Sequence, residues 1–212
     1  MISPDVLLLD EPLANLDAKL REEMRFYVRS LQQEVGITTV YVTHDQAEAM
    51  VIADRIAVMF AGRIHQLAEP REIYHRPETA MVAEFIGLTN FIAGEIAGRD
   101  GDLVILETAL GSLRGAGRPP ETGEKSRVLI VRPEAIRASR EPGPAAQNRL
   151  AGTVRAVAFL GNLVDYRVEV SPGMVLRVQG DPHAGIGAGE RVHLTFDPAA
   201  TWSVPAREGE PA

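Results

Sequence analysis

Three side chains near the start of the chain, Asp10, Glu11 and His44, have residue types and positions that suit phosphate chemistry. An aspartate at the end of a strand can offer oxygen to Mg²⁺, directly or through water. A glutamate beside it can orient and deprotonate an attacking water, and a histidine at the same edge can donate a hydrogen bond to a transferring phosphoryl group. The alternative is structural: a strand that ends in surface acids, and a histidine that caps a loop.

Two predicted strands must bring these residues together. Val6–Leu9 are four consecutive large apolar residues, which is typical of a strand buried on both faces. Residues 37–43 are rich in β-branched side chains and predict a second strand. A strand–helix–strand unit places its strands in parallel, with ligands at their carboxyl ends. We therefore expect His44 at the edge that carries Asp10 and Glu11.

The helix between these strands is predicted over residues 17–35, where apolar side chains recur at three- and four-residue steps. Asn15 or Asp17 can cap its start, and Gly36 suits its end. Further along, Gly, Pro and Thr residues that start or end elements predict helices over 46–53, 70–74 and 79–85. They also predict a hairpin of strands 55–60 and 63–67.

Four motifs closely resemble the second half of the nucleotide-binding subunit of an ABC transporter, and specifically the importer ATPases with a C-terminal regulatory extension. In order they are VLLLDEP, ANLDA, VYVTHDQAEAM and ADRIAVMFAGRI. The resemblance implies that Asp10 is the magnesium-associated carboxylate of the Walker B strand, bound directly or through water, and that Glu11 is the catalytic base. His44 matches the switch histidine that senses the terminal phosphate.

The same resemblance extends to the turn after the first strand and to the cofactors. Residues 14–17 match the D-loop, which places Asp17 near the nucleotide and the opposite subunit, although the family often has Ser where this chain has Ala14. ATP and Mg²⁺ are the cofactors implied. A homodimer of ATPase subunits, transmembrane permease subunits and a solute-binding protein are the partners implied, with a location at the cytoplasmic face of the plasma membrane reached only through those partners.

Other motifs of the family do not occur in these 212 residues. There is no G-x-x-x-x-G-K-[ST] phosphate loop (Walker A), no glutamine loop and no LSGGQ-type signature. We therefore expect a partial P-loop NTPase that lacks its N-terminal half, whose first strand misses neighbours that would bury it. A natural truncation, a gene fragment and one half of a split ATPase all remain open, and without a phosphate loop we do not expect this chain to bind ATP alone.

Composition limits the other classes of function. Hydrophobic residues make up 45% of the chain, which supports a packed core. The net charge is −7, so the chain offers no electrostatic attraction for nucleic acid. The chain has no cysteine, which excludes disulfides and thiolate metal sites. No apolar run approaches the roughly 18 residues that a membrane helix needs. These features predict a cytosolic protein.

The pattern changes near residue 88, which predicts an α/β domain over 1–87 and an all-β domain over 88–212. Glycines and prolines separate the β-rich runs, which is typical of small antiparallel OB-like barrels. A first series of runs covers 91–96, 103–107, 112–114 and 126–131, and a second covers 152–160, 164–170, 174–179, 191–196 and 202–204. Residues 139–149, between the series, are predicted to form a loop.

Parts of the β-rich region resemble the transport-associated OB-type (TOBE) extension of these ATPases. The residues are Val131–Ile136, Phe159–Asn162 and Gly189–Leu194. In the family this extension mediates dimer contacts and regulation, sometimes by binding an effector. Arg132 and Glu134 are candidate regulatory residues, and the alternative is that they simply tie strands together.

Three functions remain open at this stage. The first is the ATP-binding subunit of an importer for a small solute, the second a non-catalytic regulatory or dimerisation module, and the third one half of a split ATPase. Residues 89–92 and 166–168 look most like the polyamine and ferric-iron branch. Sugar and glycerol-phosphate importers share the architecture, and the sequence does not fix the transported solute.

Overall fold

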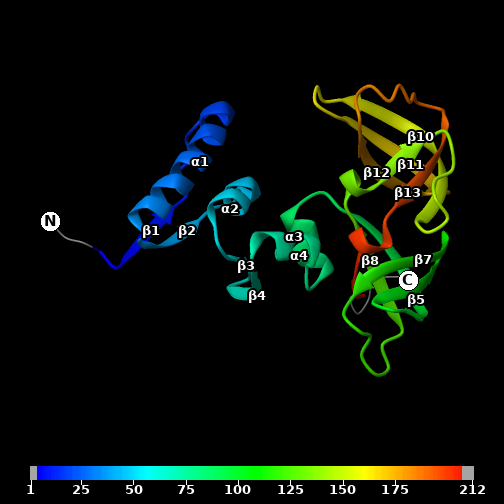
Figure 1. The fold of residues 1–212 in the computed structure, drawn as a ribbon, viewed down its shortest axis with the longest axis horizontal. Coiled ribbons are helices and arrows are strands. Elements are labelled where there is room, and N and C mark those ends of the chain that lie inside the picture. The colour runs from blue at the N-terminus through cyan, green and yellow to red at the C-terminus, as the bar shows by residue number, and fades with distance from the viewer. Residues whose placement is uncertain (1–3, 207–212) are drawn as a thin grey trace. The chain divides into compact units, whose positions relative to one another are not determined.

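The structure, a computed structural model, describes residues 4–206. The chain divides into two compact units, residues 1–74 and 75–212 (Figure 1). The first unit mixes helices and strands, and the second consists mostly of strands. Among the described residues, no helix is long and apolar enough to cross a membrane.

The first unit opens with the predicted strand–helix–strand pattern. Strand β1 (Val6–Asp10) pairs in parallel with β2 (Thr38–Val42), and helix α1 (Ala18–Val35) connects them. Asp10 faces Val42 as the last pair of the ladder, so the residues that follow both strands emerge at one edge.

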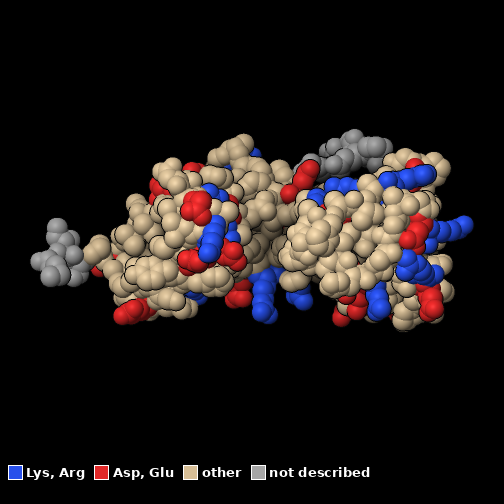
Figure 2. Space-filling view, turned by 90° about the horizontal axis from the view of Figure 1, so that it is seen from above, with Lys and Arg blue, Asp and Glu red and all other residues tan. Residues whose placement is uncertain are grey.

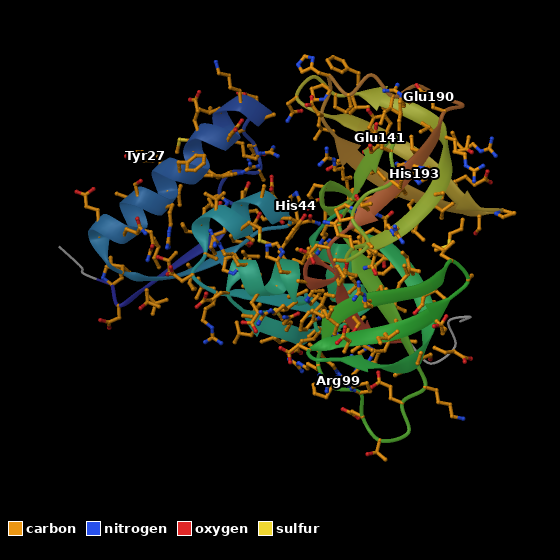
Figure 3. All side chains as sticks on the ribbon, turned by 45° about the vertical axis from the view of Figure 1, so that its right-hand side comes forward. Tyr27, His44, Arg99, Glu141, Glu190 and His193 are labelled. Atoms are coloured by element: carbon orange, nitrogen blue, oxygen red, sulfur yellow. The ribbon has the colours of Figure 1, made fainter. Side chains whose placement is uncertain are left out.

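Helix α1 begins and ends as its sequence predicts. The Asp17 side chain accepts a hydrogen bond from the backbone N–H of Leu20 at 3.0 Å, and Gly36 ends the helix in the left-handed conformation with φ 68°. None of the helix residues is buried, and Tyr27 lies exposed on its surface (Figure 3). In β1, which pairs only with β2 among the described strands, Leu8 is 72% exposed.

The rest of the first unit follows the predicted order closely. It contains α2 (Gln46–Ile52), β3 (Ile56–Phe60), β4 (Arg63–Ala68) and α3 (Pro70–His75), whose last residue falls on the far side of the division. Strands β3 and β4 form the expected antiparallel hairpin, with Ala61 and Gly62 at φ 47° and 74°. Positive φ at both turn residues matches the twist of a two-residue hairpin.

The second unit contains a closed barrel whose strand order is β14-β7-β6-β5-β8. These strands are β5 (Asn90–Asp100), β6 (Leu103–Thr108), β7 (Gly111–Gly117), β8 (Ser126–Val131) and β14 (Trp202–Pro205). The prediction that residues 202–204 belong to the second series is wrong. Strand β14 returns to the first barrel, antiparallel to β8 and parallel to β7.

The second series forms a five-stranded sheet ordered β12-β11-β10-β13-β9. Its strands are β9 (Arg137–Ser139), β10 (Asn148–Phe159), β11 (Val164–Ser171), β12 (Met174–Gly180) and β13 (Arg191–Phe196). The loop predicted over residues 139–149 is therefore shorter than expected, because Ser139 ends β9 and Asn148 begins β10. Asn148 is buried and exchanges hydrogen bonds with the backbone of Arg114.

One continuous apolar core joins the barrel to the sheet. Leu106 and Leu129 of the barrel belong to the same buried cluster as Tyr166 and Leu194 of the sheet. Helix α4 (Ala80–Ile86), capped by Thr79 as predicted, packs its buried Ala83 in a smaller cluster with β8. Residues 75–87 thus belong to the same compact unit as the strands that follow.

Candidate functional site

The backbone turns sharply where β1 ends. The N–H of Glu11 donates to the carbonyl of Val42 at 2.9 Å, which extends the contact between the two strands by one residue. Glu11 has φ 44°, in the left-handed region that residues other than glycine adopt uncommonly. This conformation directs the chain into a short turn, in which the N–H of Ala14 donates to the Glu11 carbonyl and Leu13 is buried.

The structure brings Glu11 and His44 together. The Nδ1 atom of His44 lies 2.9 Å from Oε1 of Glu11, and both side chains reach solvent, with 74% and 46% of their area exposed (His44 is labelled in Figure 3). The hydrogen bond to Glu11, followed by the charge of the same carboxylate, raises the pKa of the His44 imidazole above its ordinary value. A protonated imidazole presents two N–H donors, of which Glu11 uses one.

Asp10 ends β1 with an exposed carboxylate. Within residues 4–206, this carboxylate has no hydrogen bond or ion pair. Mg²⁺ in nucleotide sites is commonly held by one or two carboxylates together with phosphate oxygens and water. The Asp10 side chain fits that role, because its oxygens are not engaged by another protein group.

Asp17 does not join this group in the described structure. Its carboxylate caps helix α1 through the N–H of Leu20, which is a structural task that any N-terminal capping aspartate performs. Its role near the nucleotide, in the turn that resembles the D-loop, stays a prediction.

A polar network lies directly behind His44, and sequence reasoning did not anticipate it. Glu48 is 2% exposed, and its Oε2 accepts hydrogen bonds from the hydroxyls of Tyr41 at 3.0 Å and Thr43 at 2.8 Å. Burial, and then the bond to Glu48, raise the pKa of the Tyr41 hydroxyl. The one available signal was the spacing Asp45-x-x-Glu48 before an apolar stretch, which is the pattern of a helix capping box.

Asp45 connects this network to helix α1. Its Oδ1 accepts from the N–H groups of Ala47 and Glu48, and its Oδ2 binds Arg25 at 2.9 Å. Partial burial acts to raise the pKa of Asp45, but these hydrogen bonds and the charge of Arg25 outweigh it and lower the pKa. Asp45 therefore stays ionised and fixes the start of α2 immediately after His44.

Arg132 and Glu134 lie in the second unit, at the end of β8 and in the short 3₁₀ turn Pro133–Ala135. The buried Arg132 guanidinium donates to the carbonyls of Ala83, Gly87 and Leu88 at 3.1–3.2 Å and to the Thr89 hydroxyl. Arg132 therefore ties the end of α4 to the barrel, and not one strand to another as the structural alternative predicts. A regulatory role for either residue stays a prediction.

Figure 2 shows basic and acidic side chains interspersed on the face it displays, with no continuous basic surface there. In the described residues, no group of three or more His, Cys, Asp or Glu side chains is placed to hold a metal ion.

Comparisons with known proteins match both parts of the chain. Residues 129–204 match the TOBE domain family. The spermidine/putrescine import ATP-binding protein PotA of Acidothermus cellulolyticus is 43% identical over 200 residues, covering 92% of this chain and 52% of the relative. The Fe(3+) ions import ATP-binding protein FbpC of Rhizobium etli is 40% identical over 197 residues, covering 93% and 54%.

Among solved structures, the molybdate-bound form of the cytoplasmic molybdate-binding protein ModG is similar, with a TM-score of 0.46 and 15% identity. The match covers 55% of this chain and 96% of that chain. The chain spans about half the length of the curated relatives it matches. The resemblance to the ATP-binding subunits of ABC importers, and to their TOBE extension, is therefore confirmed.

Proposed function

We propose that this chain is the C-terminal part of the ATP-binding subunit of an ABC importer. In this proposal the first unit supplies Walker B and switch residues to ATP hydrolysis, and the second is the TOBE regulatory domain. The observation that carries the proposal is the contact of Glu11 with His44 at the carboxyl edge of two parallel strands. The similarity to import ATP-binding proteins along most of the chain supports it.

Each residue of the edge has a defined task in this proposal. When bound, ATP supplies the phosphoryl group and Mg²⁺ neutralises part of its charge. Glu11 accepts the proton of the attacking water. His44 donates Nδ1–H to Glu11 and keeps Nε2–H for a phosphoryl oxygen, which the raised pKa of its imidazole favours. Asp10 offers an oxygen to the metal.

The test is ATP hydrolysis with and without the missing motifs. A polypeptide of these 212 residues has no phosphate loop, so we expect no measurable Mg²⁺-dependent hydrolysis from it alone. Joined to the N-terminal half of a relative such as the Acidothermus protein, it should hydrolyse ATP, and Glu11→Gln should abolish that turnover. A folded hybrid that binds ATP but never turns it over would refute the proposal.

The transported solute and the partners are part of the same proposal. The relatives are named for import of spermidine/putrescine and of Fe(3+) ions, so we infer a polyamine or ferric-iron importer. Sugar or glycerol-phosphate remains the alternative. A second ATPase subunit, permease subunits and a solute-binding protein would complete the importer, and the permease would hold this chain at the inner face of the membrane. Uptake of labelled putrescine or iron in a deletion strain tests the solute.

A second candidate is a non-catalytic regulatory or dimerisation module. The continuous core of the second unit favours it, because this unit has its own buried interior whereas α1 of the first unit buries no residue. Residues 75–212 should then unfold in one cooperative transition on their own. Loss of that cooperativity would count against the module.

If the chain is one half of a split ATPase, co-expression with the upstream half should restore ATP binding.

A further inference from the structure

Glu48 has a buried carboxyl group that forms an ion pair with no cation among the described residues of the first unit. Within residues 4–206 it forms no ion pair, and its side-chain partners are the hydroxyls of Tyr41 and Thr43. Burying a polar or charged group is unfavourable unless hydrogen bonds compensate for the lost contact with water. A buried polar network whose hydrogen bonds are all satisfied makes its surroundings rigid, so the network around Glu48 can hold a segment of chain in one conformation.

The segment that this network holds is the one that carries His44. The Thr43 hydroxyl donates to Glu48 at 2.8 Å and accepts from the N–H of Asp45 at 2.9 Å. The Thr43 hydroxyl therefore links the residues on both sides of His44 to each other and to Glu48. The His44 side chain takes no part in these bonds and contacts Glu11.

This arrangement departs from an ordinary capping box. In that motif the glutamate three residues after the cap bonds directly to the N–H of the capping residue. Here the hydroxyl of Thr43 stands between the Glu48 carboxylate and the N–H of Asp45. The extra link contributes nothing to the capping of α2, whose first N–H groups already bind the Asp45 side chain. It constrains the residue before His44.

We propose that Thr43 and Glu48 form a positioning pair that holds the His44 imidazole against the Glu11 carboxylate. Glu48 lies behind the edge and contacts neither Glu11 nor His44 through a hydrogen bond, so it is a positioning residue and not a catalytic one. The inference rests on the proposed function for its purpose, but the geometry it describes requires no nucleotide.

The test measures which ring nitrogen of His44 carries the proton in the neutral imidazole. Long-range ¹H–¹⁵N spectra of the full 212-residue chain report this, with His44 assigned through His44→Gln. In the parent chain the bond to Glu11 should favour Nδ1–H. Thr43→Val should lower the ratio of Nδ1–H to Nε2–H several-fold, and Thr43→Ser, which keeps the hydroxyl, should restore it.

Thr39→Val is the matched control. Thr39 lies on the same strand, and its hydroxyl donates to the carbonyl of Ile37 at 3.1 Å without any link to His44. This change should leave the ratio unchanged. Should Thr43→Val fail to fold, Glu48→Gln keeps an acceptor for both hydroxyls and should lower the ratio by less than Thr43→Ala does.

Two results would overturn the proposal. One is a parent chain with no preference for Nδ1–H, and the other is a ratio that stays the same in every folded Thr43 and Glu48 variant. The hybrid ATPase separates this failure from failure of the proposed function. If the ratio changes with Thr43 in a hybrid that does not hydrolyse ATP, the positioning pair is supported and the ATPase proposal is rejected. If the hybrid hydrolyses ATP but the ratio does not change with Thr43, the ATPase proposal is supported and the positioning pair is rejected.

Discussion

Glu11 Oε1 and His44 Nδ1 lie 2.9 Å apart although 33 positions separate the two residues in the sequence. The contact depends on the parallel pairing of β1 and β2, because Glu11 directly follows β1 and His44 lies two residues after the end of β2. It also depends on the left-handed conformation of Glu11, which few residues other than glycine adopt without cost.

The first prediction concerns the titration of His44. Its pKa is raised by the bond to Glu11, so Glu11→Gln should return the pKa toward its ordinary value near 6.5. A pKa that is higher in the folded state stabilises the fold below the unfolded-state pKa, and the stabilisation disappears as pH rises through the folded-state pKa. NMR titration of His44 in the parent chain and in the variant measures this. Equal His44 pKa values in parent and variant would contradict the prediction.

The strand–helix–strand unit was predictable because its signals are local. Four apolar residues, a capping aspartate and a β-branched run each define one element, and Gly36 ends the helix in the conformation that glycine favours. The two strands of such a unit run parallel, so Glu11 and His44 emerge at the same edge of the sheet.

The network behind His44 was harder to predict, because nothing in the sequence says that Glu48 is buried. Glutamate is mostly exposed in proteins, and only the contacts with Tyr41 and Thr43 reveal its role. Strand β14 was misassigned for a related reason: local patterning predicts a strand, but not which of two sheets it joins. Strand β9 is three residues long and was too short to be recognised as a periodic pattern.

The second prediction concerns Arg132, which binds three carbonyls at the end of α4. Arg132→Met should lower the free energy of unfolding of the second unit by about 1.5–3 kcal/mol, the range for hydrogen bonds to a charged group. Arg149→Met removes an exposed arginine of β10 and should change stability little. Urea denaturation followed by circular dichroism compares them, and equal losses for both variants would show that Arg132 is not a special anchor.

The third prediction is an acid sensitivity at Glu124, which binds the buried Arg127 at 2.8 Å. Burial acts to raise the pKa of Glu124, but hydrogen bonds from Arg127 and from the N–H of Glu121, with the charge of Arg127, lower it. A lowered folded-state pKa stabilises the protein above the unfolded-state pKa, 4.5, and this is lost as pH falls through the folded-state pKa.

Glu124→Gln should therefore destabilise the second unit clearly at pH 7 and much less at the lowest pH at which the barrel stays folded. Urea midpoints measured at several pH values provide the comparison. Glu121→Gln, three residues earlier, removes an exposed carboxylate and serves as the control. A Glu124→Gln effect that is independent of pH would reject an ionised pair as its cause.

The last prediction tests how the barrel closes. Strand β14 fits between β7 and β8, where Val204 is 1% exposed and a Cβ on Gly117 would lie 2.1 Å from the Ser203 hydroxyl. Val204→Ala should cost about 2 kcal/mol of unfolding free energy, since it leaves a cavity in a closed core. Val175→Ala, on edge strand β12 and 46% exposed, should cost much less.

Trp202, the single tryptophan of the chain, reports on the same strand. Its indole N–H donates to the Pro77 carbonyl at 3.0 Å, and the Arg76 guanidinium lies 5.8 Å from the ring centre. Gly117→Ala should push β14 away from β7 and shift the Trp202 emission to longer wavelength before the rest of the unit unfolds, whereas Gly98→Ala, which has open space for a Cβ, should not. If the Trp202 emission stays unchanged in a folded Gly117→Ala variant, closure of the barrel does not require the close approach of β14 to β7.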